Sequence, residues 1–306
     1  MGGTFWEGVG GKLAERFASA SAHALLFWLG GLLAWLSTHG GLAALHPSTG
    51  WFQERSGAAQ AAVLVVVLAV VAGSAVLVER LVPPALAVLE GHWGRWLRPL
   101  AARLVVRRTA RAERLVRRFQ ELAGPVHDGT ATARERDEYT RVSRAFRRLP
   151  TGDRLLPTRV GNILRAAETR PVDKYGLDAV ALWPHLWLLL PDTARDELAA
   201  ARRALDSSVA AALWGLLFVA FTPWGWWALP VGLVAAAAAV SVWVPARAEA
   251  FADLVEAAFD LYHPVLYRQL RWPLPAHPDA DRAEGRRVST YLTRGLTGTT
   301  PAFTDD

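Results

Sequence analysis

The chain has 306 residues, of which 52% are hydrophobic and 20% are charged, and its formal net charge is +6. No Asp, Glu, Lys or Arg occurs in 17–53, 56–78 or 207–246, so the charges are segregated. This segregation excludes a single conventional soluble core, and it excludes disorder for most of the chain. It predicts an all-α polytopic membrane protein with four transmembrane helices and a helical cytoplasmic region.

The usage of single residue types narrows this interpretation. There is no Cys, which excludes disulfides, thiolate metal sites and cysteine nucleophiles. The basic residues are almost all Arg, since only Lys12 and Lys174 are lysines, and the chain is rich in Ala, Leu and Val. That usage is typical of a GC-rich bacterial genome. We expect no cofactor, because the chain has no P-loop, dinucleotide fingerprint or zinc-protease motif.

The first part of the chain predicts a helical hairpin across the membrane. Phe5, Val9, Leu13 and Phe17 recur every four residues, so 1–18 is expected to form an amphipathic interfacial helix. A hydrocarbon core of about 30 Å needs ~20 apolar helical residues. Two such spans are predicted, with an external loop between them: transmembrane helix 19–38, loop 39–57 and transmembrane helix 58–78.

Residues 79–206 are predicted to form a basic helical cytoplasmic region. Pro83-Pro84 is expected to stop or kink the preceding helix. A long helix should follow over 85–123, with an interruption near Pro99. Further on we expect a loop at 124–130 and a charged helix at 134–148.

The second half of this region contains the most distinctive stretch of sequence, 156–168. Thr158 is expected to cap a helix there, and Gly176 is expected to make a turn. Residues 179–190 are too short to span and are expected to be broken at Pro184, so they are predicted to be an interfacial or packing element. The next helix should open near Thr193 and continue into the third span.

The C-terminal part predicts a second hairpin followed by a cytoplasmic helix and a tail. A re-entrant pair is the alternative to two full crossings, because both halves of the hairpin are short. The predicted segments are transmembrane helix 207–222, external turn 223–230, transmembrane helix 231–244, cytoplasmic helix 245–272 and flexible tail 273–306.

The distribution of basic residues predicts the orientation. Segment 79–206 holds 24 of the 34 basic residues, whereas loop 39–57 has only Arg55 and the turn 223–230 has none. Segments rich in basic residues stay in the cytoplasm. Both termini are therefore expected on the cytoplasmic side of a bacterial cytoplasmic membrane, and the hairpin tips are expected on its outer side. The tips would carry an outer belt of interfacial anchors: Trp35, Trp51, Trp224, Trp226 and Trp227.

Arginine and Trp/Leu alternate along the helix expected after the second span. This pattern suits a helix docked at anionic headgroups, and it equally suits a helix in a cytoplasmic bundle with a solvated basic face. Because the positive-inside bias already explains the positive charge of this helix, we expect no nucleic acid partner. The headgroup contacts would be Arg95, Arg98, Arg103, Arg107 and Arg108.

The cytoplasmic helix after Pro245 carries an acidic stripe. Glu249, Asp253, Glu256 and Asp260 share one face, and His263 lies three residues after Asp260. Asp260 and His263 are therefore weak candidates for metal ligands, although no second Glu-x-x-His completes a bundle site. The favoured interpretation is an acidic face that pairs with neighbouring arginines, with no metal.

Three segments resemble a group of bacterial multi-span membrane proteins that have no known activity. They are Gly8–Phe17 with Phe27–Gly31, the stretches 156–168 and 175–187, and Phe259–Tyr262 with Leu270–Pro275. The resemblance covers much of the chain and implies a membrane protein, but it brings no catalytic residues.

The leading functional hypothesis is a non-enzymatic, membrane-anchored scaffold or interaction protein that binds a partner through its cytoplasmic helices. Glycines such as Gly30 and Gly31 permit close helix approach within a bundle or a homo-oligomer. One alternative is an oligomeric channel, and a weaker one is a membrane-embedded enzyme using Asp260 and His263. The channel would be lined by Ser207, Ser208, Thr222 and Ser241.

Overall fold

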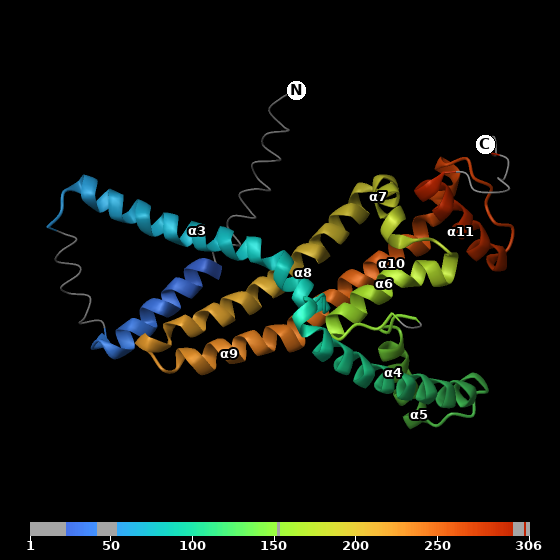
Figure 1. Cartoon of the computed structure of the whole chain (residues 1–306), viewed down its shortest axis with the longest axis horizontal. Coiled ribbons are helices and arrows are strands. Elements are labelled where there is room, and N and C mark those ends of the chain that lie inside the picture. Colours follow the sequence, from blue (N-terminus) through green and yellow to red (C-terminus); the bar gives the residue numbers. More distant parts are fainter. Residues whose placement is uncertain (1–22, 42–53, 152–153, 296–302, 304–306) are drawn as a thin grey trace. The chain divides into compact units, whose positions relative to one another are not determined.

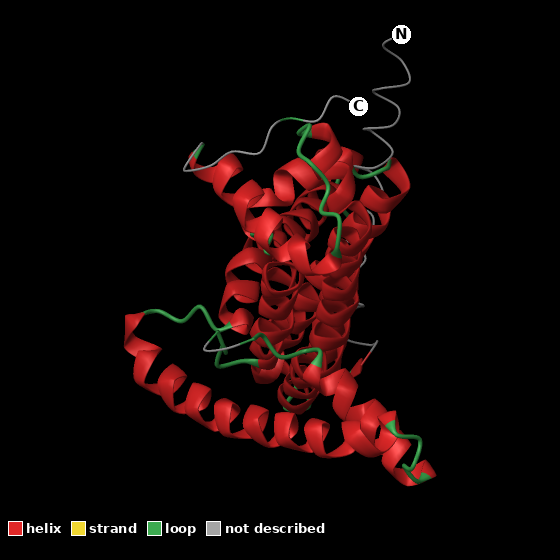
Figure 2. Cartoon of the chain, turned by 90° about the vertical axis from the view of Figure 1, so that its right-hand side faces the viewer, coloured by secondary structure: helices red, strands yellow, loops and turns green. Residues whose placement is uncertain are grey.

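The computed structural model describes residues 23–41, 54–151, 154–295 and 303. Every regular element in this part of the chain is a helix and no strand occurs in it (Figure 2), which confirms the all-α class. The predicted helix 1–18 lies outside the described residues, as does Trp51. The chain divides into two compact units, Met1–Leu86 with Asp206–Val244 and Ala87–Leu205 with Pro245–Asp306.

Unit 1 contains the apolar helices (Figure 1). Three helical runs are long and apolar enough to cross a membrane, and they begin at Gly57, Asp192 and Ala228. The helix His23–Thr38 is also apolar but shorter. The elements of the three runs that enter unit 1 are α3 (Gly57–Glu90), α8 (Asp192–Phe218), η3 (Val219–Trp224), α9 (Ala228–Ala238) and the π-helical turn η4 (Ala239–Trp243).

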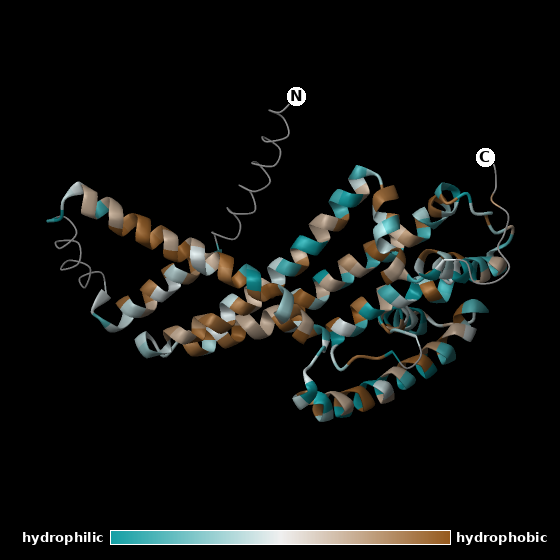
Figure 3. Ribbon diagram, turned by 45° about the horizontal axis from the view of Figure 1, so that its top comes forward, coloured by the Kyte–Doolittle hydropathy of each residue, from teal (hydrophilic) through white to brown (hydrophobic). Residues whose placement is uncertain are grey.

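The apolar residues of α3 lie mostly on the outside of the protein. Only 17% of its most apolar stretch is buried, and Val65 and Leu68 are 64% and 63% exposed. Brown, hydrophobic positions predominate along this helix in Figure 3. A soluble monomer rarely exposes a contiguous apolar surface of this kind, so the helix has the surface expected of a membrane-spanning segment.

Aromatic side chains hold the interior of unit 1 together. Phe27 packs against Trp214 and Phe221, with ring centroids 4.8 and 4.9 Å apart. Trp28 donates a hydrogen bond through Nε1 to Ser74 Oγ of α3, at 3.1 Å. These contacts fix helix His23–Thr38 against both α3 and α8.

Glycine allows close helix approach at two places in this unit. A Cβ built at Gly31 would lie 2.3 Å from the Phe221 ring, which bears out the expected role of this glycine. Gly215 and Gly232 were not predicted, yet each lets the backbones of α8 and α9 meet, since a Cβ on Gly215 would lie 2.7 Å from the Ala236 nitrogen.

Prolines end fewer helices than the sequence suggested. The prediction that Pro83-Pro84 stops the helix is wrong, because α3 continues to Glu90. The two prolines leave the carbonyls of Glu79 and Arg80 without their helical partners. These are the first charged residues after the apolar run, so water can take over the lost hydrogen bonds.

Other predicted boundaries also shift. The break near Pro99 lies instead at 91–94, and Pro99 stands in the first turn of α4 (Arg98–His127), where a missing N–H costs nothing. The predicted loop at 124 begins only after His127. Pro245 does not start a new helix either, because α9 continues through η4 into α10 (Val244–Gln269).

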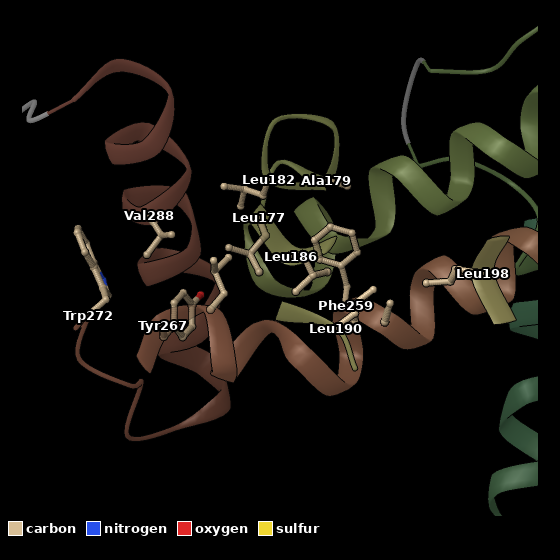
Figure 4. Close-up of a cluster of buried hydrophobic side chains, with 12 residues drawn as sticks. Leu177, Ala179, Leu182, Leu186, Leu190, Leu198, Phe259, Tyr267, Trp272 and Val288 are labelled. Carbon is tan, nitrogen blue, oxygen red and sulfur yellow. The ribbon is translucent and has the colours of Figure 1, made fainter. Parts of the chain in front are cut away.

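Unit 2 is a bundle of helices around its own core. Its main elements besides α4 and α10 are η2 (Arg95–Leu97), α5 (Ala133–Phe146), α6 (Arg159–Tyr175), α7 (Ala179–Leu189) and α11 (Pro278–Arg294). Figure 4 shows the core cluster, in which Leu182 and Leu186 of α7 meet Phe259 and Tyr267 of α10. Residues 179–190 are therefore a packing element, and α7 continues through Pro184 without a break.

The prediction of a flexible tail over 273–306 is wrong for its first half. Residues 278–294 form α11, and Val288 is fully buried in the core cluster. A Cβ on Gly285 would lie 1.8 Å from the carbonyl oxygen of Tyr175, so α11 packs directly on the end of α6. Residues 296–302 and 304–306 lie outside the described part.

Candidate functional site

The distinctive stretch around Leu156 forms the start of α6. Thr158 Oγ1 accepts a hydrogen bond from the Gly161 nitrogen at 3.0 Å, which confirms the predicted cap. The buried Asn162 side chain accepts from the Leu156 nitrogen at 2.7 Å and donates to the carbonyls of Leu156 and Thr158 at 3.0 and 2.8 Å. A Cβ on Gly161 would lie 1.9 Å from the carbonyl oxygen of Glu90, so only glycine fits here.

Three of the four carboxylates of the acidic stripe of α10 pair with basic residues, as the favoured interpretation predicted, and Asp253 is the exception among the described contacts. Glu249 contacts Arg148 at 2.6 Å and Arg159 at 3.0 Å. About two helical turns further along α10, Glu256 contacts Lys174 at 2.7 Å and also forms an ion pair with Arg170. These bonds tie α10 to α6 and to the end of α5.

Asp260 extends this pairing to the end of α6. It accepts hydrogen bonds from Lys174 Nζ at 3.0 Å and from the Tyr175 hydroxyl at 2.8 Å. Burial lowers the pKa of Lys174, but its hydrogen bonds to Glu256 and Asp260 outweigh this and raise the pKa. Burial and the hydrogen bond to Asp260 raise the pKa of Tyr175, which keeps this hydroxyl protonated.

Beside these ion pairs between α10 and α6, unit 2 contains an open groove with a volume of about 1140 Å³. Its walls come from α4, α5 with the loop after it, α6 and α10. The lining combines apolar and charged side chains. The apolar lining comprises Ala112, Val116, Phe146, Leu149, Pro150, Leu155 and Ala257, and the charged lining comprises Glu113, Arg117, Arg147, Arg170, Asp173, Lys174, Asp253, Glu256 and Asp260.

Two of the charges in the groove have no partner in the described part of the chain. Asp253 is exposed on α10 and Arg147 is exposed just after α5, and neither forms an ion pair with a described residue. Most other lining charges are engaged, as in the pair Arg117–Glu113. Among the residues that the structure describes, the groove therefore offers one carboxylate and one guanidinium without an ion-pair partner, together with apolar side chains.

The hairpin of α4 and α5 forms one side of this groove. The Phe119 ring stacks on Phe146 and Tyr139, with centroids 4.7 and 5.4 Å apart. Arg118 makes two hydrogen bonds to the Glu138 carboxylate, at 2.7 and 2.9 Å. Thr132 caps α5 in a reciprocal arrangement with Glu135.

The candidate metal ligands Asp260 and His263 do not share a site. Asp260 is held by Lys174 and Tyr175, whereas the buried His263 contacts Asp281 of α11 at 3.3 Å through Nε2. Its Nδ1 lies 2.7 Å from the Phe259 carbonyl, so both ring nitrogens are occupied. No group of three potential metal ligands occurs among the described residues.

The four polar residues suggested for a pore differ in their surroundings. The hydroxyls of Thr222 and Ser241 donate to the carbonyls of Val219 and Ala237 in their own helices, at 2.6 Å each. Ser207 is exposed, while Ser208 next to it is buried.

The tryptophans predicted as interfacial anchors gather at one end of unit 1. Trp227 Nε1 donates to Ser37 Oγ at 3.3 Å. Ser37 lies two residues after Trp35 in the chain. Trp224 and Trp226 are 44% and 79% exposed in the same turn. The described members of the belt are therefore neighbours, as expected for the tips of two adjacent hairpins.

The arginines proposed for headgroup contact fall into two groups. Arg95, Arg98, Arg103 and Arg107 are exposed. Arg108 is half-buried and donates through Nε to the Pro157 carbonyl at 2.8 Å, so part of its guanidinium is engaged within unit 2. Burial, together with the charges of Arg111 and Arg159, lowers its pKa.

Comparison with protein-family models, with curated proteins and with solved structures finds no match. The functional argument therefore rests on the residues of this chain.

Sequence reasoning missed the groove and the docking of α11. The groove depends on how four helices pack, which no local pattern encodes. The signal for α11 was present: Pro278 stands in a first turn that also holds Asp279 and Asp281, and Val288, Tyr291 and Leu292 follow at helical spacing.

Proposed function

We propose that this protein is a membrane-anchored interaction protein of the bacterial cytoplasmic membrane, with unit 1 in the bilayer and both termini in the cytoplasm. In this proposal four helices cross the membrane: His23–Thr38, α3, the end of α8 with η3, and α9 with η4. The exposed apolar surface of α3 supports the crossing. The positive-inside bias supports the orientation.

The groove of unit 2 carries the functional part of the proposal. Its volume of about 1140 Å³ is above the range of about 300–1,000 Å³ for small-molecule pockets. Helices form most of its walls, and its lining combines apolar side chains with charges of both signs, of which Asp253 and Arg147 have no ion-pair partner among the described residues. These features suit an amphipathic helical segment of a partner protein, whose apolar face would lie on Phe146 and Leu149.

The free charges add a specific expectation for that segment. A basic side chain of the partner would pair with Asp253, and an acidic one would pair with Arg147. Neither charge has to be released from another described residue before the partner binds.

The experiment compares two tryptophan substitutions on one helix. Ala112 lines the groove, whereas Ala110 is exposed on α4 and does not. Affinity purification of the tagged full chain from its native membranes is expected to recover one stoichiometric protein. Ala112→Trp should abolish this recovery because the indole fills the groove, and Ala110→Trp should leave it unchanged. Equal recovery with both variants would reject the groove as the binding site.

The channel and enzyme alternatives gain no supporting observation. The hydroxyls of Thr222 and Ser241 bond to carbonyls of their own helices, and Asp260 and His263 are engaged by different partners.

A further inference from the structure

The positive charge of this chain is concentrated on one helical arm, η2 with α4 and α5. Residues 95–148 contain 15 arginines and six carboxylates, so this arm carries a larger positive charge than the whole protein. The two ends of the arm differ. Residues 91–112 hold six arginines and no carboxylate, whereas all six acids lie further along.

The arginines at the start of the arm are also free. Arg95, Arg98, Arg103 and Arg107 are exposed and form no ion pair or hydrogen bond with any residue that the structure describes. Further along, Arg118 is bound by Glu138 and Arg148 is bound by Glu249. The start of the arm is therefore an unneutralised cationic surface.

Large apolar side chains stand exposed among these arginines. Trp96 is 89% exposed, and Leu97, Leu100 and Val106 are 48%, 47% and 69% exposed. The neighbouring Trp93, in contrast, donates its indole N–H to the Val88 carbonyl. An exposed Trp and Leu surrounded by arginine is the composition of a surface that enters the interface of an anionic membrane.

The chain brings this surface close to a bilayer. The uncharged run 56–78 would cross the hydrocarbon core, and Glu79 and Arg80 would mark its edge. Ten residues then separate Arg80 from the end of α3, which is about 15 Å of helix. The headgroup layer extends ~5–7 Å beyond the core and the Debye length adds about 8 Å. The length of helix is the largest distance that the end of α3 can have from the core, and a tilt of α3 from the bilayer normal brings the start of the arm down to the headgroups.

We propose that the start of this arm docks on the anionic leaflet of the membrane that unit 1 crosses. Trp96, Leu97 and Leu100 enter the headgroup region, while Arg95, Arg98, Arg103 and Arg107 bind lipid phosphates. The inference rests on the proposed membrane crossing and is independent of the groove. Because all six carboxylates of the arm lie in its distal half, docking is confined to its start and leaves α5 in water.

The absence of Cys makes a site-specific test straightforward. The full chain carrying Leu100→Cys is labelled with an environment-sensitive fluorophore and reconstituted in vesicles of phosphatidylcholine, with or without phosphatidylglycerol. With phosphatidylglycerol the emission should shift to the blue, and spin-labelled lipid should quench it. A label at Thr140→Cys of α5 should stay in water with both lipid compositions.

Matched charge variants then test the arginines. Each Arg contributes about a fivefold change in the docking equilibrium, so Arg95→Gln, Arg98→Gln, Arg103→Gln and Arg107→Gln together should abolish the shift. The control removes four exposed arginines of α5, Arg134, Arg136, Arg141 and Arg144, by the same substitution and should retain it. A Trp96→Ala variant should weaken the quenching.

The possible failures are distinguishable. If the chain is removed from the vesicles by alkaline extraction, the membrane crossing itself is wrong. If the chain resists extraction but the Leu100→Cys label remains in water with phosphatidylglycerol, docking is wrong and the crossing stands. A label that responds only to added duplex DNA or to an acidic protein would also overturn the proposal, as would equal loss of the shift in both charge variants.

Discussion

Replacing Gly285 by Ala should separate α11 from the end of α6 within unit 2. A Cβ at this position would lie 1.8 Å from the carbonyl oxygen of Tyr175 and 2.9 Å from its carbonyl carbon. Carbon–oxygen contacts in proteins are about 3.3 Å or longer, so α11 must move by ~1.5 Å. The obstacle is backbone at the end of α6, which cannot turn aside as a flexible side chain would.

The size of the effect follows from what this movement disturbs. Overpacking alone costs about 1–3 kcal/mol. The shift also strains the hydrogen bond from the Asp178 nitrogen to Ser289 Oγ, worth ~1 kcal/mol, and lifts Val288 out of its buried position. We expect the free energy that holds α11 in place to fall by about 3 kcal/mol, which corresponds to a roughly hundredfold change in its opening equilibrium.

Hydrogen exchange measured by mass spectrometry on the full chain provides the assay. Amides of 286–294 should exchange about a hundredfold faster in Gly285→Ala. The matched control is Gly124→Ala in α4, where a Cβ meets nothing within 4 Å and should stabilise the helix by ~0.5–1 kcal/mol. Unchanged exchange of α11 in Gly285→Ala, or an equal acceleration in the control, would refute this reasoning.

Three further predictions concern unit 2. Phe259→Ala should destabilise it by about 3–5 kcal/mol, because this fully buried ring lies in the core cluster, and a thermal melt showing no loss would contradict that assignment. Asn162→Ala should lower the stability by several kcal/mol, because three hydrogen bonds are lost and the backbone groups of Leu156 and Thr158 lose their partner. Hydrogen exchange at 156–162 checks this, and Thr140→Ala serves as a control. The hydrogen bond from Arg118 lowers the pKa of Glu138, so its stabilisation of the α4–α5 hairpin is complete above the ordinary pKa of 4.5 and is lost as the pH falls below it. Exchange of α5 amides should accelerate in acid, and Glu138→Gln should remove that part of the pH dependence.

Much of the architecture could be predicted because local chemistry determines it. The absence of charge over 56–78 and 207–246 marks the apolar parts of all three long helical runs in the described part of the chain. Thr158 is recognisable as a helix cap, since a hydroxyl before a helical segment satisfies a free backbone N–H. The spacing of Glu249 and Glu256 places them on one face, and the abundance of arginine makes their pairing the expected outcome.

The errors and omissions arise where tertiary surroundings override a local rule. Pro83-Pro84 and Pro245 lie in helices that continue, because their surroundings compensate for the missing N–H groups. Arg108 looked like its neighbours in the sequence, yet the fold turns it to the Pro157 carbonyl. The segment after Pro273 has the composition of a loop, although Val288 is buried in the core cluster and Gly285 packs against the Tyr175 backbone.

The central claim is that unit 1 crosses the membrane and leaves the helices of unit 2 in the cytoplasm. Single cysteines introduced into the Cys-free chain test it directly, one at Trp226 in the exposed turn and one at Arg136 on α5. In intact spheroplasts a membrane-impermeant maleimide should label Trp226→Cys, and it should label Arg136→Cys only after permeabilisation. Labelling of both positions from the outside, or of neither until the membrane is opened, would contradict the claim.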